Sequence, residues 1–221
     1  MLLRQMFEKD SCTYTYLLAG SKGGGEALII DPVNIKTDHY LSLIDELNLK
    51  LVKAIDTHVH ADHVKGLGTL RDKTNCVTVM GKESSVDVVS MRVEDGDKIE
   101  IDGLCLNVIH TPCHTSDSYC FYTPGMIFTG DTLSIRGTGR KDLQGGNSAD
   151  AYNSLFNKLL KLPEHTLVYP GHDYKGDSCS TIGEERAFNP RLQVKSASEY
   201  ANIMDNLALP SPAMMDIVTP K

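Results

Sequence analysis

The stretch His58-Val59-His60-Ala61-Asp62-His63 directly follows the apolar segment Leu51–Ile55, which is typical of a buried strand. His58 and His60 are two residues apart, so in an extended chain their side chains face the same side. Asp62 and His63 come after the chain turns and can face another direction. The run can therefore supply one metal position or two adjacent ones.

Three further metal-binding side chains follow, each where an apolar segment ends: His114 after Cys113, Asp131 after Phe128-Thr129-Gly130, and His172 after Val168–Gly171. Loops at strand ends let ligands from several elements converge on one ion, and imidazoles with carboxylates suit a catalytic metal. Asp131 is the natural shared or bridging carboxylate. The other histidines do not pair with further ligand residues in the sequence, so they are interpreted as ordinary core or surface residues: His39, His110 and His165.

Composition favours one domain spanning residues 1–221, because 221 residues with 41% hydrophobic content are ample for a sizeable core. The net charge of −7 and the isoelectric point near 5.6 argue against a nucleic-acid partner. A small substrate remains compatible with this charge.

Six cysteines are present and none forms a Cys-x-x-Cys pair, so we expect reduced thiols rather than a thiolate zinc site. The first ten residues carry acids early and lack the apolar stretch of a signal peptide. No run approaches the ~20 apolar residues that span a bilayer. We therefore expect a cytoplasmic enzyme without a membrane partner.

Short strands and turns dominate the first two thirds of the sequence, and Tyr14–Leu18 with Ala27–Ile30 predicts a hairpin. A short helix is expected over Leu43–Leu49. Apolar spacing predicts a longer helix over Ser148–Lys161, and Ser196-Ala197-Ser198-Glu199 is a capping box that begins another helix through about Leu207. Further strands are expected at Val77–Met80, Lys98–Ile101, Leu104–Ile109, Tyr119–Tyr122 and Met126–Thr129. This pattern indicates an α+β fold of two sheets with helices packed outside.

The ligand series, His-x-His-x-Asp-His followed by single His, Asp and His residues, resembles the metallo-β-lactamase superfamily over nearly the whole chain. The resemblance implies an αββα sandwich of two mixed β-sheets flanked by helices. Because this fold hosts hydrolases, nucleases and oxygenases, it does not by itself fix the reaction.

A narrower resemblance lies between the ligands. Residues 135–144, 170–176, 181–186 and 189–191, together with residues 3–8 and 11–13, are similar to the persulfide dioxygenase branch, the relatives of the ethylmalonic-encephalopathy protein. This implies a mononuclear non-haem Fe(II) site that oxidises glutathione persulfide with O₂ and water to sulfite and glutathione. The branch often forms homodimers.

Carried over residue by residue, the resemblance implies that His58, His114 and Asp131 are the iron ligands, one iron per chain. The remaining members of the series would orient the ligands, donate hydrogen bonds or shape the pocket: His60, Asp62, His63 and His172. The sequence alone still allows a second metal at these four residues.

Arg140 and Tyr174 stand at positions that resemble the substrate-lining residues of the branch. An arginine suits a carboxylate, and a tyrosine offers a hydroxyl and an apolar face. The alternatives are an ion pair of Arg140 with Asp142 or another acid, and core packing of Tyr174.

Two alternatives stay open. A glyoxalase II-like hydroxyacylglutathione hydrolase would use all seven ligands for two metals and a bridging hydroxide. A non-catalytic binding module would leave the ligand set without a reaction. The sequence also departs from the branch at Cys113, where glycine is expected, and at Lys141 and Leu143. Cys113 is interpreted either as a small loop residue or as a reactive thiol near the metal.

Overall fold

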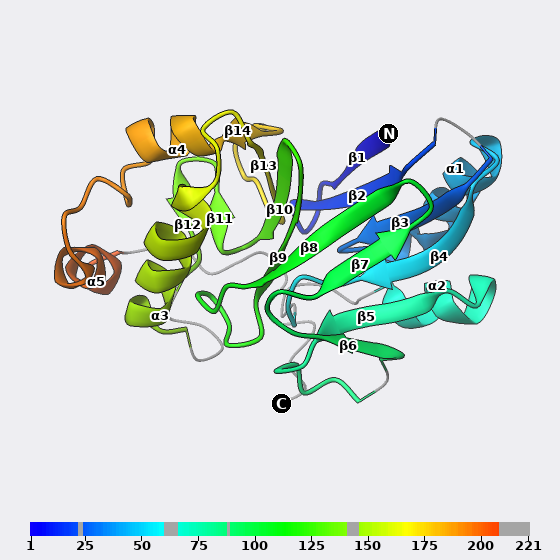
Figure 1. The fold of residues 1–221 in the computed structure, drawn as a ribbon, viewed down its shortest axis with the longest axis horizontal. Helices are drawn as coiled ribbons and strands as arrows, with labels where there is room; N and C mark the ends of the chain where they lie inside the picture. Colours follow the sequence, from blue (N-terminus) through cyan, green and yellow to red (C-terminus); the bar gives the residue numbers. More distant parts are fainter. Residues whose placement is uncertain (22–23, 60–65, 88, 141–145, 208–221) are drawn as a thin grey trace. The chain divides into compact units, whose positions relative to one another are not determined.

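The computed structural model describes residues 1–21, 24–59, 66–87, 89–140 and 146–207 (Figure 1). The described chain forms two six-stranded sheets, one two-stranded sheet and several helices. Its contacts divide it into two compact units. Among the described residues, the first is built from 1–93 and 97–106, and the second from 94–96 and 107–207.

A mixed six-stranded sheet forms the first unit, in the order β1-β2-β3-β4-β5-β6. The strands β1, β2 and β3 pair antiparallel, whereas β3, β4, β5 and β6 pair parallel. The predicted hairpin is thus confirmed as β2 and β3. The six strands are β1 (Leu2–Glu8), β2 (Thr13–Ala19), β3 (Glu26–Ile30), β4 (Lys50–Ile55), β5 (Val77–Gly81) and β6 (Met91–Val93).

Two helices, α1 (Thr37–Glu46) and α2 (Leu67–Thr74), form the first core together with one face of this sheet. Tyr40 of α1 and Leu70 of α2 are fully buried against Leu17 and Ile29 of the strands. The helix predicted over Leu43–Leu49 begins earlier, at Thr37, and ends at Glu46. A short 3₁₀ turn, η1 (Asn34–Lys36), precedes it.

The second six-stranded sheet has the order β14-β13-β10-β9-β8-β7. Its strand β8 passes from the first unit into the second at Leu106, and β10 pairs antiparallel with β9 but parallel with β13. A hairpin, β11 and β12, follows β10. The strands are β7 (Lys98–Ile101), β8 (Leu104–His110), β9 (Tyr119–Thr123), β10 (Met126–Gly130), β11 (Leu133–Ser134), β12 (Gly137–Thr138), β13 (Leu167–Pro170) and β14 (Ser180–Thr181).

Helices of the second unit surround a core that contains Ile127, Leu155, Val168 and Tyr200. The predicted helix over Ser148–Lys161 is helical throughout, but it is not one regular α-helix. It is α-helical in α3 (Ser148–Tyr152), π-helical in η2 (Asn153–Lys158) and 3₁₀ in η3 (Leu159–Lys161). Two more helices are α4 (Ile182–Phe188) and α5 (Ala197–Asp205).

The capping box predicted at Ser196 is confirmed, because its hydroxyl accepts a hydrogen bond from Glu199 N, 3.2 Å away. All six cysteines lie in the described ranges, and each is a free thiol. Among the described residues, no helix is long and apolar enough to cross a membrane.

Candidate metal centre

Asp131 and His172 come together because β10 and β13 are parallel neighbours. Gly130 pairs with Pro170, so the residues that follow each strand leave the sheet at the same edge. Gly171 has no side chain at the point of closest approach, and a Cβ there would lie 2.9 Å from Asp131 Oδ1. Glycine at this position therefore lets the two functional side chains meet.

The contact between them fixes the tautomer of His172. His172 Nδ1 lies 2.6 Å from Asp131 Oδ1. An ionised carboxylate only accepts hydrogen bonds, so Nδ1 carries the hydrogen and donates it. The other oxygen, Oδ2, is left to face His114.

His114 follows strand β8 and is nearly buried. Its Nδ1 lies 3.2 Å from the main-chain oxygen of Arg140. A carbonyl oxygen accepts, so Nδ1–H donates and Nε2 keeps the lone pair that a metal needs. Gly139 permits this approach, because a Cβ there would lie 2.8 Å from both Asp131 O and His114 Cβ.

His114 Nε2 lies 4.0 Å from Asp131 Oδ2. Metal bonds to imidazole nitrogen and carboxylate oxygen are about 2.1 Å long, so two ligand atoms of one ion can be at most ~4.2 Å apart. The observed separation falls within this limit. A neutral imidazole and a carboxylate are also donors that iron, zinc and manganese accept. These residues therefore fit a divalent transition metal.

His58 belongs to the first unit, where it follows β4 and is buried. Thr57 Oγ1 donates to Asp31 Oδ2, 3.0 Å away, and lies 2.9 Å from His58 Nδ1. Because the hydroxyl hydrogen is used on Asp31, Thr57 accepts from His58 Nδ1–H. His58 Nε2 then carries the lone pair that a metal would need, as in His114.

The sequence interpretation missed Asp31 and Thr57. Asp31 is buried, has a left-handed backbone (φ +51°) and also accepts from Thr57 N at 2.7 Å. Its position directly after an apolar strand, Ala27–Ile30, was the available signal. The two residues tie the β3 end to the start of the histidine run.

Arg140 and Tyr174, the predicted substrate residues, both lie in the second unit. The Tyr174 side chain is 65% exposed, so the alternative of core packing does not hold. Its ring is parallel to that of His172, with 6.3 Å between centroids. Asp173 Oδ2 accepts from the main-chain nitrogens of Lys175 and Asp177, at 2.9 and 2.8 Å, which fixes the loop that carries Tyr174.

Cys113 is fully buried beside the metal-binding candidate His114. Burial raises the pKa of its thiol to about 12, and nearby Cys120 and Asp131 act in the same direction. At neutral pH the group is therefore a protonated thiol, which is a poor nucleophile. This environment favours the interpretation of Cys113 as a packing residue.

Three members of the ligand series, His60, Asp62 and His63, lie outside the described residues, as do the departures Lys141 and Leu143. Of the described members, the structure brings Asp131, His114 and His172 together within the second unit.

Comparison with known proteins gives a consistent result. The sequence profile of the Metallo-beta-lactamase superfamily matches residues 12–88 and 83–172. The mitochondrial persulfide dioxygenase ETHE1 of Mus musculus is 44% identical over 223 residues, which covers 100% of this chain and 87% of the relative. A probable hydroxyacylglutathione hydrolase of Schizosaccharomyces pombe is more distant, at 31% identity over 82% of each chain.

The crystal structure of ETHE1 from Myxococcus xanthus superposes with a TM-score of 0.93 at 43% identity, covering 99% of this chain and 96% of the other. This match confirms the predicted fold of two mixed β-sheets with helices. The full-length identity also confirms the narrower resemblance drawn from the segments between the ligands. The chain belongs to the metallo-beta-lactamase superfamily and, within it, to the family of the ETHE1 persulfide dioxygenases.

Proposed function

We propose that this protein is a persulfide dioxygenase, which converts glutathione persulfide, O₂ and water into glutathione and sulfite with release of two protons. The observation that carries the proposal is the 44% identity with a persulfide dioxygenase along the entire chain. The reaction transfers two oxygen atoms from O₂ and one from water to the terminal sulfur, while the inner sulfur leaves as the glutathione thiol.

The proposed metal ligands are His58, His114 and Asp131, which would hold one Fe(II) per chain. Two imidazoles and one carboxylate form the donor set of many non-haem iron oxygenases. Bound there, iron would supply the activation of O₂ that oxidation of the persulfide sulfur requires. The protein's part is to hold each histidine ligand in one tautomer. The contacts of Thr57 with His58 and of Arg140 O with His114 serve this purpose.

His172 is proposed as a hydrogen-bond donor to Asp131 rather than as a ligand of a second metal. Here Oδ1 of Asp131 accepts a hydrogen bond of 2.6 Å from His172. The contact would hold Asp131 in one orientation, and the family resemblance is what favours one metal over two. His60, Asp62 and His63 remain proposed pocket or orienting residues on the basis of the family resemblance.

Arg140 and Tyr174 are proposed to bind the glutathione portion. Arg140 offers a guanidinium for a glutathione carboxylate. Tyr174, exposed and parallel to the His172 ring, offers a flat apolar face and a hydroxyl. Their role would be to place the persulfide sulfur at the metal, which lowers the entropic cost of bringing the reactants together.

A hydroxyacylglutathione hydrolase is the second candidate, since the Schizosaccharomyces pombe relative bears that name. It would require two metals per chain and a hydroxide between them. Metal counting separates the candidates. One iron per chain, retained when His63 is replaced by Ala, supports the dioxygenase, whereas two metals and the loss of one in His63→Ala support the hydrolase.

The decisive experiment is oxygen uptake by the anaerobically iron-loaded protein on addition of glutathione persulfide, with sulfite measured in the same sample. We expect one sulfite for each O₂ consumed. His58→Ala, His114→Ala and Asp131→Ala should each lose iron and turnover. Absence of uptake by protein that holds one Fe(II), together with hydrolysis of lactoylglutathione, would replace this proposal with the hydrolase.

We further propose that residues 1–221 act as a single metallo-β-lactamase-like domain, that the protein is cytoplasmic and that it forms a homodimer. Light scattering combined with size-exclusion chromatography tests the dimer, which a mass near twice the 24.3 kDa of one chain would support.

A further inference from the structure

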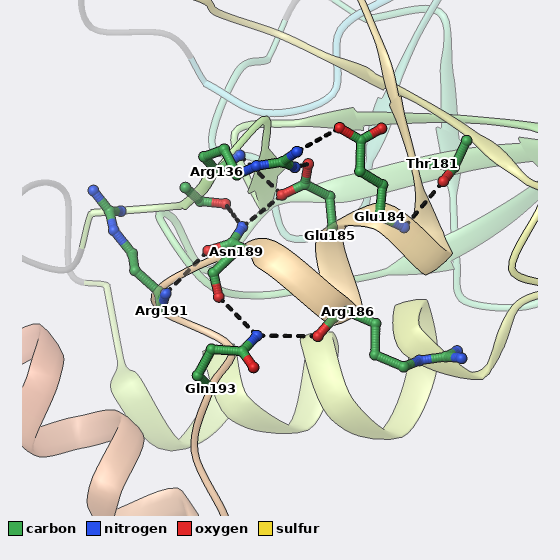
Figure 2. A network of polar contacts seen from close by, with 9 residues as sticks. Arg136, Thr181, Glu184, Glu185, Arg186, Asn189, Arg191 and Gln193 are labelled. Atoms are coloured by element: carbon green, nitrogen blue, oxygen red, sulfur yellow. Dashed lines mark hydrogen bonds and ion pairs between the residues drawn. The ribbon is translucent and has the colours of Figure 1, made fainter.

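Two segments that carried the family resemblance, Thr181–Arg186 and Asn189–Arg191, take no part in the proposed metal or substrate contacts. In the structure the β11–β12 hairpin and its turn are contacted by side chains from both segments, namely Glu184, Glu185, Asn189 and Arg191 (Figure 2). We call Glu185, Asn189 and Arg191 the β12 bracket. The bracket and the hairpin both lie in the second unit.

Glu185 binds the turn of the hairpin. Its side chain is fully buried, and it accepts hydrogen bonds from Arg136 N at 2.9 Å and from Arg136 Nη1 at 2.6 Å (Figure 2). Arg136 also contacts Glu184 and has a left-handed backbone (φ +56°). A left-handed conformation is unfavourable for a non-glycine residue, and these charged contacts stabilise it at the turn.

Asn189 and Arg191 bind the two residues that follow. Asn189 is fully buried, and its Nδ2 donates to Gly137 O at 2.9 Å and to Glu185 Oε2 at 2.8 Å (Figure 2). Arg191 Nη1 donates to Thr138 O at 2.5 Å. Asn189 Oδ1 in turn accepts from Arg191 N at 3.1 Å. Three consecutive residues of the hairpin are thus tied, one by one, to the bracket.

The next two residues are Gly139 and Arg140, and the Arg140 carbonyl accepts the hydrogen bond from His114 Nδ1. Gly139 N also donates to Thr132 O at 3.3 Å, which closes the hairpin next to Asp131. A shift of the hairpin main chain would therefore move the carbonyl that selects the His114 tautomer. The bracket is thus linked to the candidate ligand His114 by the main chain of residues 138–140.

We infer that Glu185 and Asn189 are positioning residues for the metal ligand His114, acting through the main chain of residues 136–140. The inference rests on the proposed role of His114 as a metal ligand. It assigns a function to the Thr181–Arg186 and Asn189–Arg191 segments that is separate from substrate binding. Neither residue touches the metal or the substrate.

Asn189→Asp tests the inference, because it keeps the shape of the side chain, removes both donors and places a carboxylate beside Glu185. The probe is Co(II) alone, titrated into metal-free protein at a temperature where every variant is folded. We expect about tenfold weaker Co(II) binding, the lower end of the loss typical for residues that orient metal ligands. The Co(II) visible spectrum should change with it, since it reports ligand geometry.

Gln193→Ala is the matched control. Gln193 Nε2 donates to Arg186 O and Asn189 O on the side away from the hairpin (Figure 2). We expect this variant to bind Co(II) like wild type. In metal-free protein, ¹⁵N shifts of the His114 ring should report one Nδ1–H tautomer in wild type and Gln193→Ala, and a mixture in Asn189→Asp.

Unchanged Co(II) affinity and tautomer in folded Asn189→Asp, with only a lower melting temperature, would overturn the inference and leave a purely structural role. Should that variant not fold, Asn189→Ser carries the same test without a second buried carboxylate. These readouts do not depend on persulfide oxidation. If Asn189→Asp weakens Co(II) binding and the wild type has no dioxygenase activity, the inference holds and the proposed reaction is rejected. If the wild type is an active dioxygenase and Asn189→Asp binds Co(II) normally, the proposed reaction holds and the inference is rejected.

Discussion

His172 Nδ1 donates a hydrogen bond of 2.6 Å to Asp131 Oδ1, and the other oxygen of the same carboxylate faces His114 Nε2 at 4.0 Å. The two oxygens of Asp131 therefore have different tasks. One is fixed by a protein donor, and the other is available to an ion. This division is what an orienting hydrogen bond to a metal-binding carboxylate provides.

Replacing His172 by Ala should weaken iron binding by about 10- to 100-fold, because Asp131 loses the donor that holds its orientation. Competition with a chromophoric chelator measures this. His165→Ala is the control, since His165 is exposed and belongs to no ligand group. Equal iron affinity of wild type and His172→Ala would show that Asp131 needs no such support.

The Asp31→Asn variant should also weaken metal binding by about tenfold. Asparagine tolerates the left-handed backbone at this position, so the change isolates the hydrogen bonds to Thr57 N and Oγ1. The amide of asparagine has one acceptor oxygen where the carboxylate has two. Thr57 Oγ1–H therefore loses its acceptor, and Thr57 Oγ1 is no longer fixed as the acceptor of His58 Nδ1–H. Iron content per folded chain after dialysis is the measurement, and full retention would contradict the role of Asp31.

Arg140→Ala should raise the KM for glutathione persulfide about tenfold or more with a small change in kcat, because a forked contact to a carboxylate is lost in both ground and transition states. Iron affinity should stay at the wild-type level, since His114 is bound by the main-chain oxygen of residue 140. Arg186→Ala, which breaks an exposed ion pair with Glu164, is the matched control. An unchanged KM would remove Arg140 from substrate binding.

Glu8 predicts a specific acid dependence of stability. Burial alone would raise the pKa of its carboxyl, but hydrogen bonds from Ser11 N and Oγ, each 2.8 Å, outweigh it and lower the pKa below the usual 4.5. As the pH falls, Glu8 is protonated in the unfolded chain at a higher pH than in the folded protein. The free energy of unfolding therefore decreases as the pH drops from 4.5 through the lower pKa of the folded state. Glu8→Gln should cost about 1–2 kcal/mol at pH 7, and the difference from wild type should shrink below pH ~4. Urea unfolding at several pH values measures it, and a constant difference would contradict the assignment.

Thiol labelling tests the environment of Cys113. Iodoacetamide at pH 7.5 should modify the exposed Cys179 in the native protein and leave the buried Cys113 and Cys120 unmodified until unfolding. Mass spectrometry of peptides identifies the modified sites. Rapid modification of Cys113 in folded protein would revive its interpretation as a reactive thiol near the metal.

Much of the fold could be predicted from local patterns. The strand Leu51–Ile55, the β2–β3 hairpin and the Ser196 cap follow from apolar runs, turn residues and capping chemistry, which act over a few residues. The helix over Ser148–Lys161 was recognised from its period, but its π-helical middle was not, because packing rather than residue type decides which main-chain hydrogen bond forms.

The candidate site divides in the same way. His114, Asp131 and His172 were found because ligand types at strand ends are visible in the sequence. The residues that hold Thr57, beside His58, and the β11–β12 hairpin were not found. Asp31 acts on a residue 26 positions away and Asn189 on one 52 positions away, and such pairs arise only when strands and helices assemble.

Arg140 has two proposed roles that belong to different atoms: its main-chain oxygen orients His114, and its guanidinium binds substrate. Its carbonyl oxygen accepts a hydrogen bond from His114 Nδ1. Every amino acid has this main-chain oxygen, so the contact does not depend on the side chain at residue 140. Under the proposed roles, variation at residue 140 would change which persulfide is accepted while the main-chain contact to His114 persists. Gly139 has no such freedom, since a single added carbon would collide with both His114 and Asp131. Adaptation to new sulfur compounds should accordingly leave residue 139 constant and proceed through residue 140.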